Sequence, residues 1–307
     1  MTLRVAFFNR FFKEWPKRAH LAEAGIEPSF GPLDCEMAEA VVFHLPTLPA
    51  GLLLERPKPA GQIWVGWCLE SRVTCPAFGD PRVRERCDLM MSHERSADVF
   101  TPYFSVPSLK GFRRPPRTEH EPIAVVHLQS NPYDRCGRNR YVFDLMRHIK
   151  VDSCGRLLKT CDREVGPGFE GRVALMARYK FTLAMENSIS SDYVTDKFYD
   201  PLTVGSVPVY RGSADVRELA PAPDCYIDAA DFESPAALAA HLRHLATDDE
   251  AYAALHAWRT RPFSPSFEQL VERVRTPTFV QLARAVRKAQ GVDRGGRSSK
   301  GSIIDGG

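Results

Sequence analysis

Short apolar runs alternate with amphipathic stretches along most of the chain. Among the first hundred residues, the runs at 3–8, 40–45 and 63–69 have the length of buried strands, whereas residues 11–24 have apolar positions at helical spacing. Buried strands that alternate with helices are typical of an α/β layer built on a parallel sheet. The first third of the chain is therefore predicted to form one α/β domain.

A second alternation of the same kind begins after residue 122. Each predicted strand is followed by a polar loop and then by a helix, which is the repeating unit of nucleotide-binding domains. Gly205 and the Ser234-Pro235 pair mark a helix end and a helix start. The predicted strands are 123–128, 181–185 and 206–210, and the predicted helices are 138–149, 193–203 and 234–245.

The stretch between Pro107 and Pro122 loses all periodicity, because prolines and paired charges interrupt both helix and sheet patterns. We therefore place the domain boundary there. A helical segment begins near Ser266 and is interrupted by Pro277, and beyond it Gly, Ser and charged residues show no period. The predicted organisation is a first α/β domain at 1–112, a second at 113–262, a C-terminal helical segment at 263–290 and a disordered tail at 291–307.

Composition agrees with a globular protein of about two domains, since 44% of the 307 residues are hydrophobic and 26% are charged. The net charge is +3, but residues 284–307 carry +4 of it, which leaves −1 for the remainder. A nucleic-acid partner is not expected, because phosphate binding needs a basic surplus in the folded body. No apolar stretch is long enough to span a membrane, and charge interrupts the start of the chain, so a cytoplasmic location is predicted.

The eight cysteines are scattered without a C-x-x-C pair, and Cys154 and Cys161 have no second pair beside them. Tetrahedral zinc needs four convergent ligands, and no Asp-x-Asp motif is present. The sequence therefore predicts reduced thiols and no resident metal.

Polar side chains concentrate in the loop that follows the predicted strand 181–185. Seven of them fall within twelve residues: Glu186, Asn187, Ser188, Asp192, Tyr193, Asp196 and Lys197. Ligands of open α/β sheets bind at this edge, and a helix N-terminus favours an anion. Solvated loop polars with a helix cap are the alternative, and spacing alone leaves both interpretations open.

This segment, FTLAMENSISSDYVTDKFYDPLTVGSVPVYRG, resembles the donor-binding motif of the α1,3/4-fucosyltransferases, family ten of the glycosyltransferases. The family pattern is close to F-x-x-x-F-E-N-S, then D-Y-[VI]-T-E-K, then G-[ST]-[VI]-P-V. The matching positions are Phe181, Glu186, Asn187, Ser188, Asp192, Tyr193, Val194, Thr195, Lys197, Gly205, Ser206, Val207, Pro208 and Val209. Asp196 departs from the pattern, which has Glu before the lysine.

Weaker resemblance extends from about residue 60 to residue 260. WVGWCLESRVTCP keeps the family's tryptophan and its Glu-Ser pair, with Arg72 in place of proline. MSHERSADVFTPYF resembles Y-R-R-x-S-D-x-x-x-P-Y, and SNPYDRCGRNRYVFDL resembles S-N followed by R-x-x-Y-x-x-x-L. No membrane anchor or stem precedes these motifs, which favours the bacterial type of the family.

The resemblance implies an α/β protein with two Rossmann-like domains facing a cleft, the GT-B type. It implies inverting transfer of L-fucose from GDP-fucose to a hydroxyl of an acceptor oligosaccharide, with O3 of N-acetylglucosamine or glucose expected and an α1,3 linkage formed. Glu70 is then the general base, and no cofactor is required, although a divalent metal can stimulate. The implied donor-binding residues are Ser130, Asn131, Arg138, Glu186, Asn187, Tyr193, Asp196 and Lys197.

Two alternatives for the function stay open, and so does the arrangement of the C-terminus. A transferase of the same scaffold can use another nucleotide sugar, and an inactive relative can bind a glycan or nucleotide without transfer. At the C-terminus, Leu282 and Val286 with their basic neighbours either lie on the inner face of an anionic membrane as a peripheral contact or form a helix packed on the protein.

Overall fold

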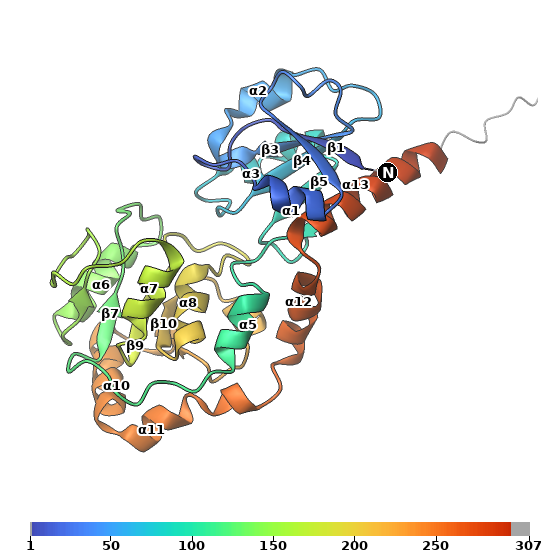
Figure 1. Cartoon of the computed structure of the whole chain (residues 1–307). Coiled ribbons are helices and arrows are strands. Elements are labelled where there is room, and N and C mark those ends of the chain that lie inside the picture. The colour runs from blue at the N-terminus through green and yellow to red at the C-terminus, as the bar shows by residue number, and fades with distance from the viewer. Residues whose placement is uncertain (1, 296–307) are drawn as a thin grey trace, which may run out of the picture. The chain divides into compact units, whose positions relative to one another are not determined.

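We describe the fold from a computed structural model, which covers residues 2–295 of the chain (Figure 1). Two compact units are present, and we describe each separately. Unit 1 comprises Met1–Thr101 together with Thr276–Gly307, and unit 2 comprises Pro102–Arg275.

Unit 1 contains a six-stranded, entirely parallel sheet in the order β2-β1-β3-β4-β5-β6. Its strands are β1 (Leu3–Phe7), β2 (Ile26–Phe30), β3 (Ala40–His44), β4 (Ile63–Cys68), β5 (Leu89–Ser92) and β6 (Val99–Phe100). Its helices are α1 (Arg18–Glu23), the 3₁₀ turn η1 (Leu45–Thr47), α2 (Ala50–Glu55), α3 (Pro76–Gly79), α4 (Pro81–Arg86) and α13 (Thr278–Gly295). The parallel sheet confirms the α/β architecture predicted for this part of the chain.

Both faces of this sheet are covered, as a parallel sheet requires. Side chains alternate along β1, so Val5 packs with α1 and α13 whereas Ala6 packs on the face of α2, α3 and α4. Leu282 and Val286 of α13 are completely buried in the first of these cores. Of the two alternatives that the sequence leaves open for this segment, the structure shows the helix packed on the protein, and the peripheral membrane contact is not supported, because the apolar face of α13 lies in the core of unit 1. Within residues 2–295 no helix is long and apolar enough to cross a membrane.

Unit 2 contains a five-stranded parallel sheet in the order β11-β10-β9-β7-β8. The strands are β7 (Val125–His127), β8 (Asp152–Ser153), β9 (Phe181–Met185), β10 (Val207–Arg211) and β11 (Ile227–Asp228). The helices are α5 (Val106–Phe112), α6 (Arg138–Met146), α7 (Gly168–Met176), α8 (Asp196–Val204), α9 (Val216–Leu219), η2 (Ala229–Asp231), α10 (Pro235–Thr247), α11 (Asp249–Ala254), η3 (Ala257–Thr260) and α12 (Pro265–Arg275).

Helices cover the two faces of this sheet in pairs. Phe181, Leu183 and Met185 of β9 face α6 and α10, whereas α7 and α8 lie side by side on the opposite face (Figure 1). The last turn of α8 closes on Gly205, whose φ of +83° lies in the left-handed region. Strand β9 and helix α8 thus frame the polar loop that carries the family motif.

The structure differs from the predicted elements where short-range geometry overrides hydrophobic spacing. Only Arg18–Glu23 of the predicted helix 11–24 is helical, because Phe11 and Glu14 close a turn and Pro16 prevents helix continuation. The sequence pattern missed β2, β5, β6, β8 and β11. Helix α8 begins at Asp196 and not at Tyr193, since Thr195 is its N-cap.

The predicted domain ranges and the compact units divide the chain at different residues. Helix α5 precedes the predicted boundary at 112, yet it packs on α8 within unit 2. The predicted segment 263–290 is shared, because α12 belongs to unit 2 and α13 to unit 1. Residues 291–295 of the predicted disordered tail are helical, and 296–307 lie outside the described residues.

Cys154 and Cys161 are joined by a disulfide within the segment that follows β8. The prediction of reduced thiols is therefore wrong for this pair, because the segment folds back and brings the two Cα atoms to 5.3 Å, within disulfide range. Six other cysteines are free thiols in the described part of the chain.

We expect the stability of the protein to fall as the pH drops from about 6.5 to about 4. His127 at the end of β7 is buried, and burial, aided by the charge of Arg138, lowers its pKa to about 4. The unfolded chain, with a histidine pKa near 6.5, then binds a proton that the folded protein excludes, at a cost of about 2 kcal/mol at pH 5. Urea titrations at pH 7.5 and pH 5.0 measure this difference.

The matched variant for this prediction is His127→Gln, which keeps a polar side chain but cannot titrate. The difference in its free energy of unfolding between pH 7.5 and pH 5.0 should be smaller than that of the wild type by about 2 kcal/mol, the contribution of one buried histidine. His44 and His256, whose pKa values burial lowers to about 4 and about 3, retain their share. An unchanged pH dependence in the variant would contradict the assignment to His127.

Candidate functional site

Two loops meet at the carboxyl edge of the unit 2 sheet, one after β7 and one after β9. The β7 loop runs from Leu128 to the start of α6, and the β9 loop runs from Glu186 to the start of α8. Because β7 and β9 are parallel neighbours, both loops emerge at the same edge. The backbone N–H of Arg135 donates to the carbonyl oxygen of Asn187 at 2.7 Å, which ties the two loops together.

Glu186 lies completely buried at the centre of the β9 loop. One carboxylate oxygen accepts from the backbone N–H of Thr195 at 2.8 Å, and the other accepts from the Thr195 hydroxyl at 3.0 Å and from Lys197 Nζ at 3.2 Å. Burial raises the pKa of Glu186, and the charge of Lys197 opposes that rise. The sequence predicts a direct donor contact for Glu186, whereas here both of its oxygens hold the start of α8.

Lys197 is the cation that this arrangement presents. Its ammonium group also contacts the Thr195 hydroxyl at 3.0 Å, and its side chain remains 30% exposed. It lies in the first turn of α8, where the positive end of the helix dipole favours an anion. A cation at this place is compatible with the donor-binding role that the family resemblance implies for Lys197.

Arg138, at the start of α6, is almost completely buried. Its terminal nitrogens donate to the carbonyl oxygens of Met185 at 3.0 Å, Asn131 at 3.1 Å and Tyr133 at 2.9 Å. The family resemblance implies that Arg138 binds the donor, but the structure uses its terminal nitrogens to fix the β7 loop against β9. Burial lowers the pKa of Arg138, while the nearby Glu186 supports its charge.

The remaining predicted donor-binding residues lie along the same two loops. Asn131 and Ser130 are exposed; the Asn131 side chain accepts from the Tyr133 N–H at 2.9 Å, and Ser130 Oγ accepts from the Arg156 N–H at 3.3 Å. Asn187 is half-buried and accepts from the Ser188 hydroxyl at 3.1 Å. Tyr193 is buried, with its ring edge-on to that of Tyr103 at 6.2 Å.

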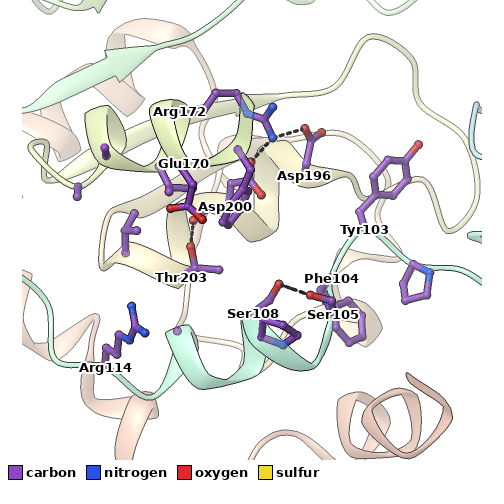
Figure 2. A pocket seen from close by; sticks show the side chains of 18 residues that line it. Tyr103, Phe104, Ser105, Ser108, Arg114, Glu170, Arg172, Asp196, Asp200 and Thr203 are labelled. Carbon is purple, nitrogen blue, oxygen red and sulfur yellow. Dashed lines mark hydrogen bonds and ion pairs between the residues drawn. The ribbon is translucent and has the colours of Figure 1, made fainter. Parts of the chain in front are cut away.

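Asp196 lines a cavity of about 750 Å³ between α5, α7 and α8 (Figure 2). Arg172 of α7 reaches across to it, with Nη2 at 3.2 Å from Asp196 and 2.8 Å from Asp200. Figure 2 shows this bridge on one wall of the cavity and Tyr103 beside Asp196. One guanidinium thus holds two carboxylates that would otherwise repel each other one helical turn apart.

Sequence reasoning missed Arg172 and Asp200. Burial raises the pKa of Asp200 to about 6, and the hydrogen bond from Arg172 opposes that rise. Asp196 and Asp200, four residues apart on one helix, could have indicated a need for a cation between them. The arginine that pairs with them lies on α7, where no sequence motif marks it.

Glu70, the predicted base, belongs to unit 1. It is half-buried two residues beyond the end of β4, and one carboxylate oxygen accepts from the Thr74 hydroxyl at 3.2 Å. Arg72, which departs from the family pattern, pairs with the buried Glu94 at 2.6 Å and 2.7 Å. No group of three or more His, Cys, Asp or Glu suited to a metal ion occurs among residues 2–295.

Comparison with known proteins identifies relatives of this arrangement. The sequence model described as "Glycosyltransferase family 10 (fucosyltransferase) C-term" matches residues 118–295. Human GDP-fucose protein O-fucosyltransferase 3 is 36% identical over 143 residues, which cover 45% of this chain and 30% of that protein. Human 3-galactosyl-N-acetylglucosaminide 4-alpha-L-fucosyltransferase is 31% identical over 234 residues, which cover 72% of this chain and 61% of that protein.

The chain therefore spans from about a third to three-fifths of the length of these relatives. A crystal structure of an alpha1,3-fucosyltransferase with GDP-fucose matches 91% of this chain and 90% of its own, with a TM-score of 0.58 at 16% identity. At that identity the match establishes the fold alone, and it confirms the predicted architecture of two Rossmann-like domains.

Proposed function

The chain belongs to glycosyltransferase family 10, the fucosyltransferases, and from this membership we propose that it transfers L-fucose from GDP-fucose to a hydroxyl of an acceptor glycan. The observation that carries the proposal is the position of Lys197. Buried Glu186 and the N-cap Thr195 hold its ammonium group at the start of α8, where the family motif predicts the donor diphosphate.

The departing GDP accumulates negative charge as the bond to fucose breaks. Lys197 supplies a positive charge for that anion, and the first turn of α8 adds backbone N–H dipoles. The buried guanidinium of Arg138 adds a positive electrostatic potential at this edge of the sheet, and it also holds the β7 loop in place. These groups favour a diphosphate leaving group.

Asp196 is suited to contact hydroxyl groups of the donor. Its side chain is 43% exposed, and Arg172 holds it in place from α7. Aspartate is one methylene shorter than the glutamate of the family pattern, so its carboxylate reaches less far. The hydrogen bond from Arg172 holds the Asp196 carboxylate in one position. The cavity beside Asp196 can receive the part of the donor that extends beyond the diphosphate.

The transfer itself is proposed to be an inverting displacement with Glu70 as the general base. An alcohol is a poor nucleophile until its proton is removed, and a carboxylate at the acceptor hydroxyl accepts that proton. The oxygen then attacks the anomeric carbon from the face opposite GDP, so a β-linked donor gives an α-linked product. Glu70 follows β4 of unit 1 by two residues and is half-buried.

The acceptor is proposed to be a glycan with an available O3 on N-acetylglucosamine or glucose. The relatives' names mention both galactosyl-N-acetylglucosaminides and proteins, so a protein-linked acceptor is the second candidate. A screen with N-acetyllactosamine, lactose and fucosylatable peptides separates the two classes. A donor other than GDP-fucose is tested by titrating GDP-mannose and UDP in parallel.

We expect Lys197→Met to weaken GDP binding on the order of 10- to 100-fold. The substitution removes the charged hydrogen-bond donor to the diphosphate, and such bonds contribute roughly 1.5–3 kcal/mol. Isothermal titration calorimetry of GDP and GDP-fucose with chelator present measures the change without any acceptor.

The matched control is Lys150→Met, which removes an exposed lysine that precedes β8, at the opposite edge of the same sheet. GDP affinity should be the same in this variant as in the wild type. Equal affinity in Lys197→Met and the wild type, or failure of the wild type to bind GDP, would contradict the proposed donor site.

A further inference from the structure

Among the buried polar atoms of unit 1 without a hydrogen-bond partner in the described residues, two belong to neighbouring side chains. They are Nε2 of His44, at the end of β3, and Nε1 of Trp67, near the end of β4. The residues are 1% and 7% exposed and lie directly opposite each other in the parallel pairing of the two strands. An unpaired buried polar group costs about 1–3 kcal/mol, so two adjacent ones call for a physical reason.

The hydrogen bonds around His44 determine which of its nitrogens carries the proton. The Thr47 hydroxyl donates to the carbonyl oxygen of Arg10 at 3.0 Å, so it accepts at its contact of 2.8 Å with His44 Nδ1. Nδ1 therefore carries the hydrogen, and burial lowers the pKa of His44 to about 4, which keeps the ring neutral. The lone pair of the buried Nε2 is an unused acceptor, and Trp67 Nε1–H is an unused donor.

His44 is held rigidly in this position. The Asn9 side chain accepts from the His44 backbone N–H at 2.9 Å and donates to its carbonyl oxygen at 2.8 Å. The same amide group donates to Thr47 at 2.9 Å. The acceptor and donor are thus presented by preorganised side chains at the carboxyl edge of the sheet.

Aromatic side chains from the loop after β1 cover the pair. The Phe11 ring stacks on Trp67 at 4.4 Å with an angle of 18°, and both Phe11 and Phe12 contact the His44 ring at 4.8 Å. Phe12 remains 47% exposed and has a φ of +52°, a conformation that costs a bulky residue on the order of 1–3 kcal/mol. The cover is therefore apolar, strained and partly in solvent.

We propose that the His44–Trp67 pair is a binding subsite for one pyranose ring of the acceptor, closed by Phe11 and Phe12 when no sugar is present. A sugar hydroxyl is both donor and acceptor, so it can donate to His44 Nε2 and accept from Trp67 Nε1–H. The apolar face of the ring can take the place of Phe11 against the indole. This inference rests on the proposed function, which supplies the need for a glycan acceptor.

The position of Trp67 in the chain agrees with this assignment. Trp67 lies three residues before Glu70, the proposed base, at the carboxyl end of the same strand. In open parallel sheets, ligands bind at that edge. The subsite is thus placed where an acceptor hydroxyl is to be deprotonated.

Indole N–H resonances test the proposal directly, because the chain has four tryptophans. The full chain is labelled with ¹⁵N-tryptophan, and Trp67→Phe identifies the Trp67 signal by its loss. Methyl glycosides of glucose, galactose and N-acetylglucosamine are titrated to high concentration. We expect at least one of them to shift the Trp67 resonance downfield, and we expect His44→Leu to abolish that shift.

Thermal unfolding supplies the second measurement. Trp67→Phe removes a buried ring together with its donor, so its Tm without sugar should fall only by the packing that the smaller ring loses, and the responding sugar should raise this Tm less than it raises that of the wild type. Its affinity for the responding sugar should fall on the order of tenfold, as loss of one hydrogen bond implies. Leu33→Ala, which truncates a 93% exposed side chain of unit 1, serves as the control for both measurements.

Two results would overturn the subsite: no shift with any of the three glycosides, or a shift that His44→Leu retains. Calorimetry with GDP separates failure of the subsite from failure of the proposed function. GDP binding without a sugar response contradicts the subsite alone, and a sugar response without GDP binding contradicts the transferase.

Discussion

Replacement of Glu70 by glutamine is expected to lower the rate of fucose transfer on the order of 10²- to 10⁴-fold while GDP binding is unchanged. Loss of a positioned general base has effects of this size. The amide oxygen of glutamine can still accept from the Thr74 hydroxyl, now at 3.2 Å from the carboxylate, so the local fold is preserved and mainly basicity is lost. Release of GDP from GDP-fucose in the presence of N-acetyllactosamine measures transfer.

Glu55→Gln is the matched control, because Glu55 is an exposed glutamate of unit 1 at the end of α2. Transfer and GDP affinity should both equal those of the wild type in this variant. Full activity in Glu70→Gln would remove Glu70 from the mechanism, and an inactive relative would show GDP binding without transfer in every variant.

The largest effect on stability is expected for Arg259→Met, which should lower the free energy of unfolding by about 3–5 kcal/mol. Arg259 is 4% exposed in η3, and its guanidinium donates to four carbonyl oxygens. These belong to Gly111 (3.4 Å), Phe112 (3.1 Å), Arg114 (3.2 Å) and Leu202 (3.0 Å). The Gly111 carbonyl oxygen keeps its bond from the Arg114 N–H at 3.0 Å, but the other three acceptors lose this donor, and the methionine side chain restores only part of the packing.

Arg259→Lys should recover little of this stability, since a single ammonium group cannot reach carbonyl groups that a planar fork spans. Arg217→Met is the control, because the Arg217 side chain is 70% exposed and pairs with an exposed aspartate at 3.7 Å. Its effect should stay within about 0.5 kcal/mol. Urea unfolding of the three variants measures the differences, and a loss below about 1 kcal/mol for Arg259→Met would contradict the structural role assigned to it.

Much of unit 2 could be predicted from the sequence because its elements are governed by local signals. Strand β9 is an uninterrupted apolar run, α10 begins with Ser234 and Pro235, and α8 ends at a glycine with positive φ. The position of the loop that carries the family motif followed from the same reasoning, since parallel strands bring their carboxyl ends to one edge. Lys197 lies where that argument places it.

The use of individual polar groups could not be predicted in the same way. Glu186 and Arg138 match the family motif, yet both are buried and spend their hydrogen bonds on Lys197, Thr195 and three carbonyl groups. Whether a charged residue faces a ligand or supports its neighbour depends on which atoms surround it after packing. Motif spacing fixes the loop and leaves that choice open.

By itself, the sequence determined the α/β class, the loop after β9 and the family resemblance, because each depends on short-range periodicity or on a contiguous motif. Only the tertiary structure decided that Arg172 bridges Asp196 and Asp200, that α13 buries Leu282 and Val286 in unit 1, and that His44 and Trp67 stand side by side with unused hydrogen-bonding atoms. These pairings join residues more than twenty positions apart, or a C-terminal helix to an N-terminal sheet. Such contacts arise from packing between elements, and no local pattern along the chain encodes them.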